Sequence, residues 1–243
     1  MPRDLPDWGA LSAQATVHEV TDMGELAVRL GSIVTHDRRG DVIWFDGFED
    51  GLEKWATFAP ADGGSVDLST VRARNGQYSA RLVADENGAT GTRIDKTIPY
   101  PVESPMGAEF SFMLDQDITQ LELVFDIYDG VRVTEYLIIW SDADNNLTYS
   151  DVGGDPQEIA AGVDLSMTPN LFHTMKLVVD MENHAYLRLI LNQTEYSLAG
   201  IAAWNDPDPT SAALRVRINM IGRAGENDVI RVDDVIITQN EPV

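Results

Sequence analysis

The run Asp142-Ala-Asp144-Asn-Asn146 carries the oxygen-bearing side chains that open an EF-hand calcium loop. Such a loop also needs a glycine at its sixth position and a bidentate acid at its twelfth. Leu147 and Gly153 occupy those two positions here. We therefore interpret the run as a turn between two strands and not as a calcium site.

Asp234 is the most informative acid, because it lies in an apolar alternating segment, Ile230-Arg-Val-Asp-Asp-Val-Ile236. In a strand, Asp234 shares one face with Ile230, Val232 and Ile236. A buried carboxylate without a partner costs several kcal/mol, so we expect it to be paired. The partner is a cation, an arginine or the donors of a hydrogen-bonded turn.

Other catalytic and metal-binding patterns are missing from the chain. His18, His36, His173 and His184 lack the spacing of a metal site, and there is no cysteine. There is also no Gly-x-Ser-x-Gly elbow and no glycine-rich phosphate loop that leads into a helix. We expect a protein without enzymatic activity and assign no catalytic residue.

A tryptophan beside polar groups is the pattern that favours sugar binding, because the aromatic ring stacks on a sugar while amides and carboxylates bind its hydroxyls. Trp204, Asn205 and Asp206 form such a group in a loop that Pro207 and Pro209 stiffen. We assign these three residues as ligand-binding candidates. The alternative is that Trp204 closes one end of the fold.

The charge balance excludes several partners. Among 243 residues, 40 acids and 17 bases give a net charge of −23, which repels nucleic acid and anionic membranes. We expect no membrane contact, because no apolar run is long enough to span a bilayer and the first residues do not resemble a signal peptide. The absence of cysteine excludes disulfides.

Residues 1–41 differ in pattern from the remainder. Asp22 can cap a short helix that Gly31 ends, and the apolar stripe of this helix needs a surface to lie on. We predict an N-terminal arm over 1–41, followed by one domain over 42–243. The arm residues expected to contact a partner are Leu5, Trp8, Leu11, Met23, Leu26 and Leu30.

After the arm, short apolar segments alternate with Gly, Asn, Asp and Pro, which is typical of an antiparallel β-sandwich. Asp129-Gly130 and Asn183-His184 have the composition of hairpin turns. The expected strands are Val42–Phe48, Tyr78–Ala84, Glu109–Leu114, Leu121–Ile127, Thr134–Trp140, Met175–Asp180, Ala185–Leu191, Leu214–Ile221 and Val229–Thr238.

Several of these segments resemble known sandwiches. Phe45-Asp-Gly-Phe-Glu-Asp-Gly51 is similar to the opening strand of jelly-roll carbohydrate-binding modules, and Gly76–Leu82 and Ile230–Ile237 are similar to later strands. Phe172–Asp180 and Tyr186–Asn192 resemble laminin G-like and concanavalin A-like sandwiches. The resemblance covers 42–238 and implies an all-β, two-sheet antiparallel jelly roll. It supports the fold more strongly than an activity.

In the resembled modules, the first and last strands are neighbours and a structural Ca²⁺ lies near them. The resemblance therefore implies a calcium site formed by Asp46, Glu49, Asp50 and Asp234, since carboxylates are hard oxygen ligands. The alternative is that Asp46 and Glu49 simply flank a turn at Gly47.

Concanavalin A-like glucanases use a Glu-x-Asp-x-x-Glu strand whose outer carboxylates cleave the glycosidic bond. The nearest match is Val124-Phe-Asp126-Ile-Tyr-Asp129, in which Val124 replaces the nucleophile. Glu122, on the same face as Asp126, is the remaining substitute. We interpret both acids as solvated outward residues of a half-exposed strand and do not transfer the glucanase activity.

An arm followed by a sandwich resembles phage decoration and tail proteins. We therefore predict a structural component of a larger assembly, most simply a homo-oligomer on the surface of a virion or extracellular particle, made in the cytoplasm without a signal peptide. The high acidity suits such a surface, and it equally suits a high-salt habitat. The alternatives are a stand-alone glycan-binding module and an unusual glycoside hydrolase.

Overall fold

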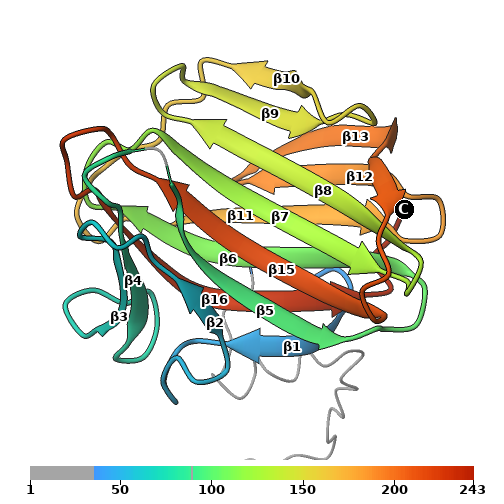
Figure 1. Cartoon of the computed structure of the whole chain (residues 1–243), viewed down its shortest axis with the longest axis horizontal. Helices are drawn as coiled ribbons and strands as arrows, with labels where there is room; N and C mark the ends of the chain where they lie inside the picture. The colour runs from blue at the N-terminus through green and yellow to red at the C-terminus, as the bar shows by residue number, and fades with distance from the viewer. Residues whose placement is uncertain (1–35, 89) are drawn as a thin grey trace, which may run out of the picture.

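The computed structural model describes residues 36–88 and 90–243, which form two stacked antiparallel sheets of eight strands each (Figure 1). Apolar residues alternate along most strands, and one side chain in two points into the space between the sheets. The predicted all-β jelly roll is confirmed, and each of the nine expected strands is present. No stretch of these residues forms a helix of the length and hydropathy that a membrane crossing requires.

The sheet that we call sheet A has the order β13-β12-β11-β6-β16-β4-β3, and β1 pairs with β16. Its strands are β1 (Asp41–Asp46), β3 (Ser65–Ser69), β4 (Ser79–Val83), β6 (Pro105–Leu114), β11 (His173–Asp180), β12 (Ala185–Leu191), β13 (Thr194–Ala202) and β16 (Val229–Gln239).

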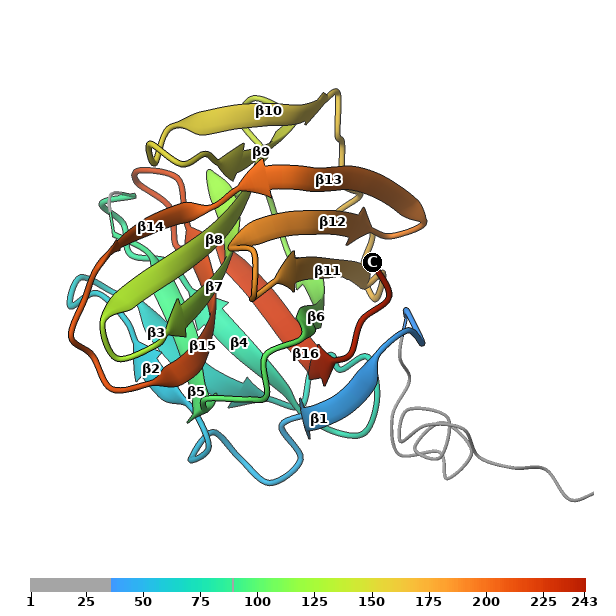
Figure 2. The same cartoon turned by 90° about the vertical axis from the view of Figure 1, so that its right-hand side faces the viewer.

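The second sheet, sheet B, has the order β10-β9-β8-β7-β15-β5-β2, and β14 pairs with β8. Its strands are β2 (Ala56–Phe58), β5 (Thr92–Pro99), β7 (Gln120–Tyr128), β8 (Arg132–Ser141), β9 (Asn146–Ser150), β10 (Pro156–Ala161), β14 (Trp204–Pro207) and β15 (Ala213–Ile221). Figure 2 shows the two sheets from the side.

The core between the sheets contains the large aromatic side chains of the central strands. Trp140 and Tyr136 of β8 are fully buried, and each donates a hydrogen bond to a backbone carbonyl. The indole of Trp140 donates to Val163 O at 2.9 Å, and the hydroxyl of Tyr136 donates to Asp180 O at 3.0 Å. Trp140 is therefore a core residue, as its apolar surroundings in the sequence indicate.

The chain enters the sandwich across the outer face of sheet A, where a buried ion network holds it. The carboxylate of Glu109 accepts the backbone N–H groups of His36 and Asp37, and the ammonium of Lys176 contacts Asp37 at 3.1 Å and Glu241 at 2.6 Å. Arg188 completes the network, because its Nη2 lies 2.6 Å from Glu241 Oε2. Both ends of the described chain are thus fixed on the same sheet face.

The predicted helix over 22–30 and the arm residues Leu5, Trp8, Leu11, Met23, Leu26 and Leu30 lie outside the described residues. The boundary between 41 and 42 also stays a prediction, although β1 begins at Asp41.

Candidate functional site

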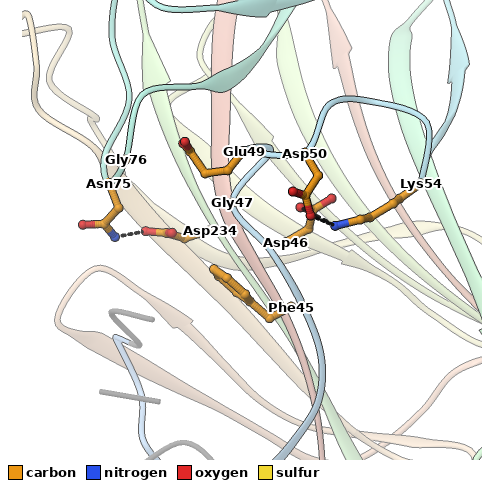
Figure 3. A pocket seen from close by; sticks show the side chains of 9 residues that line it. All are labelled: Phe45, Asp46, Gly47, Glu49, Asp50, Lys54, Asn75, Gly76 and Asp234. Atoms are coloured by element: carbon orange, nitrogen blue, oxygen red, sulfur yellow. Dashed lines mark hydrogen bonds and ion pairs between the residues drawn. The ribbon is translucent and has the colours of Figure 1, made fainter. Parts of the chain in front are cut away.

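The first candidate site is a pocket of about 280 Å³ between the end of β1, the loop before β4 and the bulge in β16. Figure 3 shows the four predicted metal ligands, Asp46, Glu49, Asp50 and Asp234, around this pocket. The structure therefore brings the four predicted residues together at one pocket, because β1 and β16 are neighbours.

Asp46 orders the loop that follows β1. Its Oδ1 accepts the N–H of Phe48 at 3.1 Å, and its Oδ2 accepts the indole N–H of Trp55 at 2.9 Å. Phe48 has a positive φ of 61° and stacks on Trp55 with ring centroids 5.5 Å apart. The loop conformation thus depends on a buried carboxylate that has already used both oxygens.

Asp50 faces a cation from its own loop. Lys54 Nζ lies 2.8 Å from Asp50 Oδ2 and 3.7 Å from Asp46 Oδ1 (Figure 3). The ammonium therefore stands where a metal between Asp46 and Asp50 would lie, and it lowers the pKa of Asp50. Lys54 therefore supplies the positive charge in this half of the pocket.

The opposite half joins Glu49 to Asp234. Glu49 Oε1 accepts the N–H groups of Gln77 and Tyr78 at 2.7 and 2.9 Å, and Asn75 Nδ2 donates to Asp234 Oδ2 at 2.5 Å. Within the described residues, no hydrogen bond or ion pair reaches Glu49 Oε2 or Asp234 Oδ1.

Two adjacent buried acids shape the bulge in β16. Asp233 Oδ2 accepts the N–H of Arg74 at 2.7 Å, and Arg74 Nη1 lies 3.6 Å from Asp234 Oδ2. Burial and the neighbouring charge of Asp234 raise the pKa of Asp233 to about 7. The arginine partner considered from the sequence is therefore present at Asp234.

The fit to calcium is limited to part of the predicted ligand set. No group of three or more His, Asp or Glu side chains is placed to hold a metal in the ranges that the structure covers. Glu49 and Asp234 retain free oxygens that suit Ca²⁺, whereas Asp46 and Asp50 are bound to protein donors. The calcium site stays a prediction, with Glu49 and Asp234 as its best donors.

The second candidate site is the outer face of sheet B, the face turned away from sheet A. The core residues Phe125, Tyr136 and Val216 point inward, so their neighbours along each strand point outward. Pairing between strands then aligns outward residues in a row across the sheet: Trp204, Glu135, Asp126, Arg215 and Thr97.

Asp126 is the buried centre of this row, so the expectation that it is solvated is wrong. Its side chain is 1% exposed, and Arg215 donates to its Oδ2 from Nε at 2.8 Å and from Nη2 at 2.5 Å. Its Oδ1 has no hydrogen-bond partner among the residues that the structure describes. Burial raises the pKa of Asp126, although the positive charge of Arg215 lowers it in part.

Glu135 stands directly opposite Asp126 and is half-buried. No hydrogen bond or ion pair to its carboxyl is formed by residues 36–88 or 90–243. Burial, followed by the charge of Asp126, raises the pKa of Glu135 above that of an ordinary glutamate. Glu135 is therefore an available acceptor, and sequence reasoning missed it although its alternation with Tyr136 was a usable signal.

The three predicted ligand-binding residues divide between two sides of β14. Trp204 is half-buried on the outer face beside Glu135, and Asp206 follows on the same face and is exposed. Asn205 points the other way, donates to Thr134 Oγ1 at 2.7 Å and accepts from Arg132. Asn205 thus attaches β14 to β8, whereas Trp204 is available to a ligand.

The remaining arginines of this face are paired. Arg217 Nε lies 2.9 Å from Asp95 Oδ1, and Arg93 Nε lies 3.2 Å from Asp95 Oδ2. Asn219 Nδ2 donates to Glu122 at 2.8 Å. The face therefore offers an aromatic ring and a carboxyl at one end, while its positive charges are already neutralised.

No protein-family model matches the chain, and no curated protein matches it. Solved structures do match. The carbohydrate esterase of the Shiga toxin-encoding bacteriophage phi24B is similar over 83% of this chain and 100% of its own length, with 12% identity and a TM-score of 0.56. A cellulose-induced protein is similar over 82% of this chain and 98% of its own, with 18% identity and a TM-score of 0.53.

A sialidase matches 85% of this chain with 10% identity and a TM-score of 0.52, and the chain spans only 19% of the sialidase. At these identities the likeness shows a shared jelly-roll fold.

Proposed function

We propose that the protein binds neutral glycans on the outer face of sheet B. The observation that carries the proposal is the pairing of Trp204 with Glu135, which places an aromatic ring beside a carboxyl that has no partner within the described residues. A sugar ring stacks its apolar face on an aromatic side chain, and its hydroxyls donate to a carboxylate. Two of the similar solved structures are a carbohydrate esterase and a sialidase, which supports a carbohydrate ligand.

The charges of the face favour a neutral glycan over a polyuronate. Arg215 and Arg217 are paired with Asp126 and Asp95, so the positive charge of each guanidinium is already balanced by a carboxylate of the protein. The net charge of −23 also repels polyanions. Leu137 and Ile139, which are half-buried on the same face, extend the apolar platform along β8.

We infer that binding occurs without hydrolysis. Glycosidases place two carboxyl groups roughly 5–9.5 Å apart on either side of the scissile bond. Asp126 is buried under Arg215, and Glu122 lies four residues along β7 from Asp126, about 13 Å away. Asp206, which is exposed on the same face, is the remaining carboxyl near Glu135. Binding without hydrolysis predicts that no new reducing ends appear when the protein is incubated with a glycan that it binds.

A role in a larger assembly remains a second proposal, and one observation favours it. The ion network of Glu109 and Lys176 fixes residues 36–39 on the outer face of sheet A, opposite to Trp204. A partner attached through the preceding residues would leave sheet B free for glycan. The virion location and the homo-oligomer stay predictions.

An array of neutral glycans followed by calorimetry tests the main proposal. Trp204→Ala should weaken binding by about tenfold or more, which corresponds to ~1.4 kcal/mol, and Glu135→Gln should weaken it less. Phe58→Ala is the matched control, because Phe58 is an exposed aromatic residue at the far edge of the same sheet. Equal affinities of wild type and Trp204→Ala would refute the site.

Removal of residues 1–35 tests the assembly proposal separately, since it leaves residues 36–39 on the body. Light scattering should then show loss of any oligomer, while glycan affinity is unchanged. If the chain that retains residues 1–35 is already a monomer, the homo-oligomer prediction is wrong.

A further inference from the structure

A cavity of about 440 Å³ lies at the open edge of the sandwich, between β9 and β10 of sheet B and β13 of sheet A. Figure 2 shows β9 and β10 above β13 at this edge. The residues that give the cavity its chemistry are Tyr149, Glu158, Ile159, Tyr196, Ser197 and Ile201.

The two strands at this edge are poorly suited to pairing with a further strand. β10 and β13 are the end strands of their sheets, but the pairing of each with its inner neighbour contains a register shift. β10 also begins with Pro156, which lacks an N–H. Bulges and proline block strand addition at sheet edges, so a small ligand fits the cavity better than an extended peptide.

The chemistry of the lining indicates a sugar. Tyr149 and Tyr196 are half-buried against the core, and neither hydroxyl makes a hydrogen bond to the residues that the structure describes. Glu158 and Ser197 are exposed at the rim and add acceptors. None of the described residues that line the cavity is a lysine or arginine. The nearby Arg39 is already paired with Glu195 at 2.7 Å, so an uncharged ligand fits the cavity better than an anion.

One residue of the cavity, Glu158, lies on the outer face of sheet B. Glu158 is paired with Thr148, and Thr148 with Ile139, so Glu158 lies two strand spacings, about 10 Å, from Ile139 on the same face. Ile139 lies four residues along β8 from Glu135, about 13 Å away. A single glycan chain of several units can therefore span from Trp204 to the cavity.

We propose that this edge cavity is a second sugar-binding site, which holds a later unit of the neutral glycan that Trp204 and Glu135 bind. The proposal rests on the proposed function and adds a length requirement to it. Two linked contacts on one ligand raise affinity through effective concentration, so long oligosaccharides bind more tightly than short ones.

Calorimetry with cello-, xylo- and manno-oligosaccharides of three and six units tests the proposal. For the series that binds, the hexasaccharide should bind about tenfold more tightly than the trisaccharide. Glu158→Ala and Tyr196→Ala should each remove most of this advantage and leave the trisaccharide affinity unchanged. Glu182→Ala, an exposed acid in the turn between β11 and β12, is the matched control.

The outcomes separate the two sites. A hexasaccharide affinity that neither Glu158→Ala nor Tyr196→Ala changes would overturn the edge site and leave the site at Trp204 intact. Because Glu158 is exposed, its variant should retain the wild-type unfolding midpoint, and any loss of binding is then a loss of contact. Failure of every series to bind the wild type would overturn both proposals.

Discussion

Replacing Lys176 with methionine should destabilise the fold and release both ends of the described chain from sheet A. The side chain of Lys176 is 0% exposed. Its ammonium contacts Asp37 Oδ2 at 3.1 Å, Glu241 Oε1 at 2.6 Å and the carbonyl of Arg39 at 3.2 Å. Methionine keeps the apolar stem but leaves these acceptors without the charge that balances them.

The expected loss of unfolding free energy depends on which partners the acceptors of Lys176 retain. Removing one member of a buried ion pair costs about 3–5 kcal/mol. Glu241 retains Arg188 at 2.6 Å and the hydroxyl of Thr238 at 2.5 Å, which places the cost near the lower end, about 3 kcal/mol. For a chain of this size, that loss lowers the melting temperature by about 6–12 °C.

Urea unfolding measures the loss of unfolding free energy, and hydrogen exchange shows which part of the structure is affected. The amides of His36 and Asp37, which donate to Glu109, should exchange faster in Lys176→Met than in the wild type. Arg81→Met is the control, because Arg81 and Asp67 form a largely exposed pair at 3.7 Å whose loss should cost less than about 1 kcal/mol. A loss below about 1 kcal/mol in Lys176→Met, or unchanged exchange at both amides, would refute the reasoning.

Three further outcomes are expected. Gly76→Ala should destabilise the protein by about 1–3 kcal/mol in urea unfolding, because Gly76 has a φ of +63° and a Cβ there would lie 2.2 Å from Glu49 Oε1; an unchanged midpoint would contradict this. If the calcium prediction is right, Ca²⁺ raises the melting temperature of the wild type and a chelator reverses the rise, whereas neither changes the melting temperature of Asp234→Asn. A wild-type melting temperature that neither Ca²⁺ nor chelator changes would refute the calcium site. Because burial raises the pKa of Glu135, Glu135 is protonated at a higher pH than an ordinary glutamate. Glycan affinity should therefore begin to fall at that higher pH on acidification. The carboxylate is the form that accepts sugar hydroxyls, so calorimetry of Glu135→Gln should show no such pH dependence.

The sequence predicted most of the fold because alternation is a local signal. Phe110 and Phe112, two residues apart, both point into the core, as the pattern around them indicates. The turn at Asp129-Gly130 is also present, with a φ of 94° at Gly130. The alternation did not predict short or polar strands such as β2 and β14. β2 has only three residues, all exposed, and β14 contains a proline.

The candidate sites were only partly predictable, since they depend on pairing between distant strands. The convergence of Asp46 and Asp234 follows from the resemblance that made β1 and β16 neighbours. The position of Lys54 between Asp46 and Asp50 depends on loop conformation, which no periodicity reveals. Glu135 could be placed on an outward face, but its proximity to Trp204 required the pairing of β14 with β8.

The indole N–H signals of the protein test glycan binding at sheet B most directly. The chain has five tryptophans, and Trp204→Phe identifies which NMR signal belongs to Trp204. Titration with the best neutral hexasaccharide should shift that signal more than the other four, because Trp204 alone among the described tryptophans lies on the outer face of sheet B. A Trp204 signal that stays in place while the glycan saturates the protein would contradict the account.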